Sequence, residues 1–288
     1  MNTHDIDALW NYNDPVASET RFRELLPDAE NGDDKGYLVE VLTQIARAQG
    51  LQAHFDDAHS TLNQAESLLT PELARATVRY LLELGRVLNS SGDKAQALPF
   101  FMEAWETAQY ANEDFYAVDA AHMIAIVKEG KDALNWHMKA IAYAEASSQP
   151  RARNWLGSLY NNIGWTYFDM GDYSAALDIF RKALVFREEK SNVETIRITR
   201  WCIAKVLRVM GRVDEALTTQ QALFAEYEAD GEESGYTDEE LGECLLALGR
   251  ADEAPPHFAR AYATLSKDIW LVKNEAERLA RLKQLGGL

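Results

Sequence analysis

Two histidines and two aspartates near residue 55 are the first side chains that could together do chemistry. His54 and His59 flank Asp56 and Asp57, and imidazole and carboxylate groups are common ligands of transition metals. The interval between the histidines, however, separates the two imidazoles around a helix surface. The run is also predicted to open a helix, where acidic side chains are stabilising. We therefore expect ordinary helix-start residues here and no metal site.

The usual signatures of catalytic and cofactor sites are missing from the sequence. It contains no G-x-x-x-x-G-K-[ST], no G-x-G-x-x-G, no H-E-x-x-H and no G-x-S-x-G. The acidic residues of 28–34 lack the order and the central glycine of a calcium-binding loop. Cys202 and Cys244 are predicted to be buried thiols without a disulfide. We accordingly expect no cofactor and no enzymatic activity.

A basic block stands out in an acidic chain. The protein has 288 residues, with 29 Lys or Arg, 46 Asp or Glu and a net charge of −17. Residues 181–212 hold nine Lys or Arg and three Glu, with Trp201 among them. Such a block suits an acidic or carboxylate-bearing extended peptide. Residues 213–253, however, contain thirteen acidic residues and one basic residue. Pairing of charges between neighbouring helices therefore remains an open alternative.

These side chains must be positioned by a repeated helical element. A small residue is followed twelve positions later by Ala and, four positions after that, by a large apolar residue. This spacing predicts two amphipathic helices, in which the small residue permits close approach and the large one fills the space between them. The matching sets are Gly85/Ala97/Phe101, Gly164/Ala176/Phe180, Gly242/Ala254/Phe258, Ala46/Ala58/Leu62 and, more weakly, Ala204/Ala216/Gln220.

A Gly-Asp or Gly-Arg pair separates the two helices of most copies, as at Gly92-Asp93 and Gly211-Arg212, and glycine favours the end of a helix. A hairpin alone leaves apolar surface uncovered, so neighbouring hairpins must stack. The predicted fold class is therefore all-α. Its six hairpins are expected near 37–69, 72–110, 112–147, 152–190, 193–229 and 235–265.

The best copy reads Tyr160-x2-Ile163-Gly164-x2-Tyr167, then Gly171-Asp172-Tyr173 and Ala176-x3-Phe180-x2-Ala183. It resembles the tetratricopeptide repeat (TPR) family. The copies are spaced by about 36 to 43 residues instead of about 34, which is similar to the long-repeat type of kinesin light chains and bacterial peptide-sensing regulators. The resemblance covers roughly residues 36–265. It implies a right-handed superhelical solenoid of about six hairpins with N- and C-terminal capping helices.

The expected organisation has three parts. Residues 1–36 form an irregular arm and a capping helix near 16–26, residues 37–265 form the repeat array, and residues 266–288 form a C-terminal capping helix. In that last helix we expect Trp270, Leu271, Leu279 and Leu282 on the inner side. Pro99 and Pro256 occupy the same phase of their repeats and are expected beyond the first turn of a helix, where proline bends it.

The resemblance also implies a binding surface, because the family holds its ligands along the concave face of the first helices. Asn161 is expected to bond a peptide backbone, and Trp165 and Trp201 to cover apolar side chains. The family's clamp for chaperone C-termini is not reproduced. The corresponding positions of this chain are Arg47, Arg79, Arg86, Asn89, Asn161, Trp165, Phe168, Trp201, Lys205 and Arg208.

The predicted function is a protein- or peptide-binding scaffold, and the alternative is a peptide-sensing regulator whose ligand changes the solenoid conformation. The partner is another protein or peptide; the acidic balance disfavours duplex nucleic acid and anionic membranes. We see no signal peptide after Met1 and no apolar stretch long enough to span a bilayer. We therefore expect a cytoplasmic protein. Homo-oligomerisation is left open.

Overall fold

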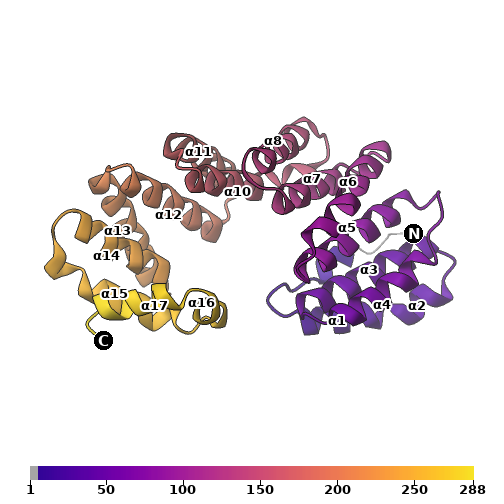
Figure 1. Cartoon of the computed structure of the whole chain (residues 1–288), viewed down its shortest axis with the longest axis horizontal. Coiled ribbons are helices and arrows are strands. Elements are labelled where there is room, and N and C mark those ends of the chain that lie inside the picture. The colour runs from indigo at the N-terminus through magenta and orange to yellow at the C-terminus, as the bar shows by residue number, and fades with distance from the viewer. Residues whose placement is uncertain (1–5) are drawn as a thin grey trace. The chain divides into compact units, whose positions relative to one another are not determined.

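The computed structural model describes residues 6–288, except for the side chain of Ile269. Over this range the chain is helical and contains no strand (Figure 1), which confirms the all-α repeat fold. The chain divides into two compact units, residues up to Leu159 and residues Tyr160–Leu288. None of the helices in the described range is long and apolar enough to cross a bilayer.

The first unit contains the N-terminal arm and three hairpins. The arm begins with a turn of 3-10 helix, η1, and two short helices follow it. Each hairpin packs against the next through its first helix, and the core runs between the paired helices. The elements are η1 (Ile6–Leu9), α1 (Pro15–Glu24), α2 (Leu26–Asn31), α3 (Lys35–Leu51), α4 (Phe55–Glu66), α5 (Ala74–Ser90), α6 (Lys94–Tyr110), α7 (Asp114–Val127), α8 (Gly130–Ala146) and α9 (Pro150–Arg153).

The second unit contains the other three hairpins and the C-terminal helices. Its core is continuous from the first of these hairpins to the last helix. The elements are α10 (Leu156–Asp169), which begins just before the unit boundary, α11 (Tyr173–Lys190), α12 (Val193–Val209), α13 (Val213–Asp230), α14 (Gly235–Ala247), η2 (Ala251–Glu253), α15 (Pro255–Leu265), α16 (Ile269–Asn274) and α17 (Ala276–Leu285). The six hairpins lie where the sequence predicts them.

The glycine-acid pairs form the turns inside the hairpins. Gly171 has a φ of +78°, a left-handed conformation that glycine adopts without strain. The next residue, Asp172, accepts a hydrogen bond from the backbone N–H of Ala175 and so caps α11. Gly92 and Asp93 do the same between α5 and α6. Two adjacent residues therefore end one helix and begin its partner.

The small and large residues of the repeat meet as the spacing predicts. A Cβ added to Gly85 would lie 2.4 Å from Cε1 of Phe101, and one added to Gly164 would lie 2.5 Å from Cε1 of Phe180. Both phenylalanines are fully buried. The glycines thus allow each ring to sit directly against the backbone of the first helix, which fixes the separation of the paired helices.

Three expectations about the C-terminal region are wrong. The single helix predicted there is two helices, α16 and α17, because the helix is interrupted at Glu275. Trp270 is 61% exposed and so does not face inward, whereas Leu271, Leu279 and Leu282 are buried as expected. Pro256 is the second residue of α15, since η2 delays the start of that helix. A proline in the first turn costs no hydrogen bond and imposes no bend; Pro99 lies inside α6 as predicted.

Candidate binding surface

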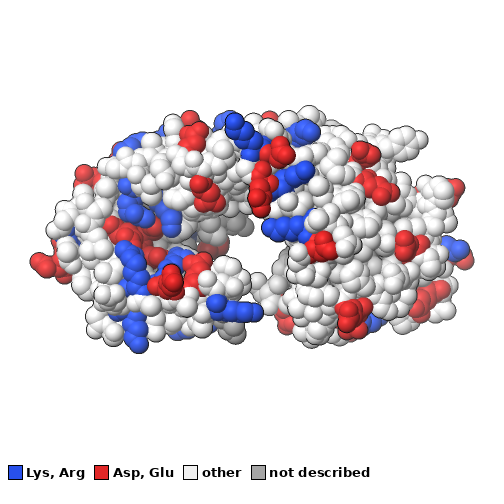
Figure 2. All heavy atoms as spheres, in the orientation of Figure 1, with Lys and Arg blue, Asp and Glu red and all other residues white. Residues whose placement is uncertain are grey.

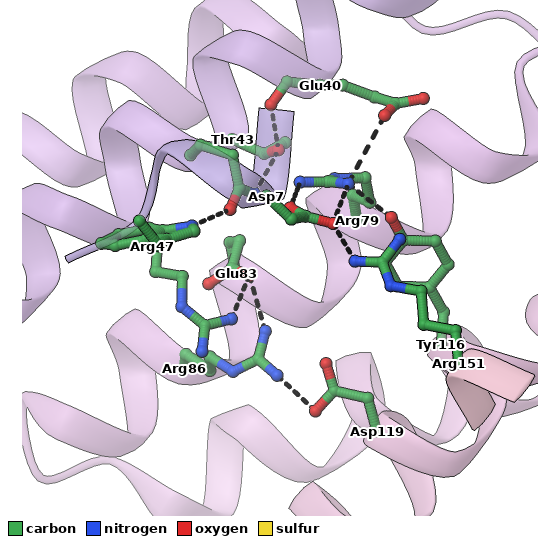
Figure 3. Close-up of polar contacts among 12 residues, drawn as sticks. Asp7, Glu40, Thr43, Arg47, Arg79, Glu83, Arg86, Tyr116, Asp119 and Arg151 are labelled. Carbon is green, nitrogen blue, oxygen red and sulfur yellow. Dashed lines mark hydrogen bonds and ion pairs between the residues drawn. The ribbon is translucent and has the colours of Figure 1, made fainter. Parts of the chain in front are cut away.

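The first helix of each N-terminal hairpin (α3, α5 and α7) contributes to a cluster of guanidinium and carboxylate groups. The N-terminal arm adds the carboxylate of Asp7 to this cluster (Figure 3). Arg79 of α5 donates from Nη2 to Oδ1 of Asp7 at 2.7 Å, and Arg151 of α9 donates to the other oxygen of the same carboxylate. Arg79 is only 2% exposed. It also contacts Glu40 of α3 at 3.5 Å and donates to the hydroxyl of Tyr116 of α7. One carboxylate of the arm thus joins α5 to α9.

A second group of ion pairs continues the cluster across α3, α5 and α7. Glu83 of α5 accepts from Arg47 of α3 at 3.1 Å and from Arg86 at 2.6 Å, and Arg86 also donates to Asp119 of α7 (Figure 3). Glu83 is 3% exposed, and its Oε2 has no hydrogen-bond partner among the described residues. Asn89, further along α5, has an unpartnered buried Oδ1. A cavity of about 170 Å³ is lined by Arg47, Glu83, Arg86 and Asn89 among others.

The arm reaches this surface through aromatic groups as well. Trp10 donates from Nε1 to Oε1 of Gln44 at 2.8 Å and stacks on Tyr12 with ring centroids 4.8 Å apart. The guanidinium of Arg47 lies 5.7 Å from the ring of Trp10 and 5.5 Å from that of Tyr12, within range of a cation–π interaction. A cavity of about 300 Å³ remains between the arm and the first helices, and Asp7, Tyr12, Arg47 and Arg79 are among its lining residues.

The surroundings of Asp7 favour its charged form. Burial by itself raises the pKa of Asp7, but the positive charges and hydrogen bonds of Arg79 and Arg151 outweigh burial, and the pKa lies below its ordinary value. Burial raises the pKa of Glu40 above its ordinary value, although Arg79 and Arg75 act in the opposite direction. Asp7 is therefore the better partner for the buried guanidinium of Arg79.

The C-terminal unit presents a row of aromatic rings on its first helices. Trp165 of α10 lies 6.0 Å from Trp201 of α12, and Trp201 lies 5.8 Å from Tyr236 of α14, measured between ring centroids. The indole N–H of Trp201 donates to the backbone carbonyl of Tyr236 at 2.9 Å. Phe168 contacts Trp165 edge-on at 5.3 Å. Oδ1 of Asn161, also on α10, lies 3.9 Å from the thiol of Cys202.

The predicted basic residues of this unit are paired within the protein. Lys205 contacts Glu240 of α14 at 3.2 Å, and Arg208 holds the same carboxylate through two hydrogen bonds of 2.7 and 3.1 Å. Glu240 is 2% exposed. Arg197 pairs with acidic residues in and after α13. Figure 2 shows basic and acidic side chains next to one another over this unit. The charge pairing that the sequence left open is thus present.

The ten residues expected at the surface fall into two sets, one in each unit. In the N-terminal unit, Arg47, Arg79 and Arg86 share one polar cluster. Six of its members were not expected, namely Asp7, Glu40, Glu83, Tyr116, Asp119 and Arg151. The spacing of the repeat does not point to any of these residues. No cluster of three or more His, Cys, Asp or Glu in the described residues is arranged to hold a metal ion.

Comparison with known proteins supports the same fold. Residues 156–194 match the family model described as tetratricopeptide repeat. The apo form of RapI is 13% identical with a TM-score of 0.75, over 98% of this chain and 79% of RapI. A signal transduction ATPase with a tetratricopeptide repeat sensor from Pyrococcus horikoshii is 12% identical with a TM-score of 0.72, over 94% of this chain and 43% of that protein.

A third similar structure is that of kinesin light chain TPR-like repeats from Podosopora anserina. It is 15% identical, with a TM-score of 0.55, over 67% of this chain and 96% of that one. No curated protein matches the sequence significantly.

Proposed function

We propose that this all-α repeat chain, in which residues 156–194 match the tetratricopeptide repeat model, is a binding scaffold, without catalysis of its own, that holds another protein or peptide on its first helices. The finer part of the proposal is that the partner segment carries a carboxylate. The observation that supports it is the pair of guanidinium groups of Arg79 and Arg151 around the carboxylate of Asp7. Two guanidinium groups around one carboxylate form charge-assisted hydrogen bonds, which are stronger and more directional than neutral ones.

The surface of the C-terminal unit contributes to the proposal in a different way. Because Glu240 already pairs with Lys205 and Arg208, those cations are partly neutralised. The aromatic row of Trp165 and Trp201 instead offers apolar faces for a partner's side chains. The ten residues expected from the sequence remain the proposed contact set, with the carboxylate held in the N-terminal unit.

The finding about Glu240 also determines which variants can test binding. A Lys205→Glu or Arg208→Glu change would place a second carboxylate against the buried Glu240, and would therefore measure folding. Arg151→Gln is better suited, because Arg151 is partly exposed and lies at the edge of the cluster. Its matched control is Arg153→Gln, an exposed arginine on the same short helix.

The experiment selects peptides from a displayed random library on the immobilised protein and measures the best of them by fluorescence anisotropy. We expect enrichment of Asp or Glu. Changing that residue to its amide should weaken binding about tenfold, or roughly 1.4 kcal/mol, and added salt should weaken it further. Arg151→Gln should reduce affinity while Arg153→Gln should not. Selection of peptides without acidic residues, or equal binding of acid and amide forms, would contradict the carboxylate proposal.

A further inference from the structure

The N-terminal arm occupies the surface that the proposed function assigns to a partner. Among the described residues of the arm, Asp7 and Trp10 contact the first helices through polar side-chain groups, and they lie three positions apart. Asp7 lies within a turn of 3-10 helix and Trp10 directly follows it, and the backbone N–H of Trp10 donates to the carbonyl of Asp7 at 3.3 Å. In such a turn, side chains three apart project from the same side. The arm therefore presents a carboxylate and an indole together.

The buried guanidinium of Arg79 needs a carboxylate partner, and the arm supplies one. Arg79 is almost fully buried, and a buried charge without a well-placed partner is strongly destabilising. Among the described residues, the other carboxylate that pairs with it is that of Glu40, at 3.5 Å. If the arm left, Arg79 and Arg151 would lose the carboxylate that both of them contact. The vacated surface would then favour a replacement with the same chemistry.

The helix that follows the arm has a cap of its own, separate from the arm's polar contacts with the first helices. In the described part of the arm these contacts come from Asp7 and Trp10, whereas α1 begins at Pro15 and is capped by Asp14. Residues 11–14 connect the two and are exposed. A connection this short also keeps the arm at a high effective concentration near its surface, so it competes well with a partner in solution.

We propose that residues 6–12 are a built-in competitor for this surface. The partner segment that they exclude would carry an acidic residue followed three positions later by an aromatic residue in a single turn of 3-10 helix. This inference rests on the proposed function and adds to it the shape of the ligand. A turn, rather than an extended strand, brings the two side chains to Arg79 and to Gln44 at once.

The probe is a labelled synthetic peptide with the sequence of residues 6–13, and its binding to the full-length chain is measured by fluorescence anisotropy. The wild-type protein should bind it weakly. Asp7→Asn/Trp10→Ala, in which the arm has lost both contacts, should bind it at least tenfold more tightly. The same peptide with Asn in place of Asp should not bind. An exposed pair in the same chain, Asp33→Asn/Trp270→Ala, is the matched control and should behave as wild type.

Hydrogen exchange of the arm amides gives a second readout that does not need the double variant. A library-selected acidic peptide, added to wild-type protein, should increase exchange of residues 6–12 and leave exchange of α1 unchanged. The single change Asp7→Asn, which keeps the side-chain shape, should do the same without peptide.

Equal affinity of the probe for wild-type protein and for a folded double variant would overturn the competitor role. The proposed function would still stand if library-selected acidic peptides bound both proteins. Failure of every acidic peptide to bind any variant would contradict the proposed function itself, and the competitor role with it.

Discussion

Gln220 offers a test of the repeat logic in which the expected result is a gain of stability. It occupies in the fifth hairpin the position that Phe101 and Phe180 hold in others. Its side chain is 0% exposed, and neither its Nε2 nor its Oε1 has a hydrogen-bond partner among the described residues. Burying an amide without partners costs about 1–3 kcal/mol. Gln220→Leu removes that cost.

The size of leucine suits this site, because the residue opposite Gln220 is Ala204 and the chain already contains the pair Ala46 and Leu62 in the same register. We expect Gln220→Leu to raise the free energy of unfolding by about 1–3 kcal/mol. The melting temperature should rise by about 2–4 °C for each kcal/mol. The assay is urea and thermal unfolding followed by circular dichroism, analysed for separate transitions of the two units.

The reciprocal change, Leu62→Gln, is the matched control. It places the amide in the first hairpin, where Leu62 is 1% exposed, and should lower stability by about 2–4 kcal/mol, as removal of core methyl groups and burial of an amide do. If Gln220→Leu is no more stable than wild type while Leu62→Gln is destabilised, then the Gln220 amide is satisfied, and the reasoning about its burial is refuted.

Two further predictions concern the glycine at the contact between paired helices and the aspartate of the N-terminal arm. Gly85→Ala should destabilise by about 1–3 kcal/mol, because the new Cβ overlaps the buried ring of Phe101. Gly50→Ala, in α3 with its nearest neighbouring atom 3.4 Å away, should be neutral or stabilising by up to about 1 kcal/mol; urea unfolding of both variants checks the difference in sign. Asp7→Asn should destabilise at neutral pH, and its difference from wild type should shrink as pH falls through the folded-state pKa, which lies below the ordinary 3.8. A difference that is unchanged between pH 7 and pH 3 in urea unfolding would show that the Asp7 charge does not stabilise the fold.

The hairpins could be predicted because their determinants are local or strictly periodic. A glycine followed at fixed distance by a buried phenylalanine specifies a close helix pair, and a glycine-acid pair specifies its turn. The position of Pro256 within its helix was predicted wrongly because the extra turn η2 precedes α15. The periodicity of the repeat does not indicate that turn. Trp270 was misplaced because the break at Glu275 re-orients the short helix that carries it.

The polar cluster was only partly predictable, for a different reason. The register of the repeat places Arg47, Arg79 and Arg86 on first helices, but it does not say which acidic groups they meet. Those partners lie on the next helix of the stack or, for Asp7, 72 residues away in the chain. Side-chain pairing across repeats depends on the packing of whole helices, which the spacing within one repeat does not determine.

The ion pairs between successive first helices have a consequence for how the chain keeps its hairpins in order. Hairpins built on one pattern could stack in the wrong sequence, or on a hairpin of another molecule, since their apolar faces are alike. The pairs Arg47–Glu83, Arg86–Asp119 and Arg208–Glu240 each join one first helix to the next. A hairpin placed beside the wrong neighbour would bury one of these charges alone, at a cost of several kcal/mol. These ion pairs therefore favour the native order of the hairpins over other orders in which their similar apolar faces could stack.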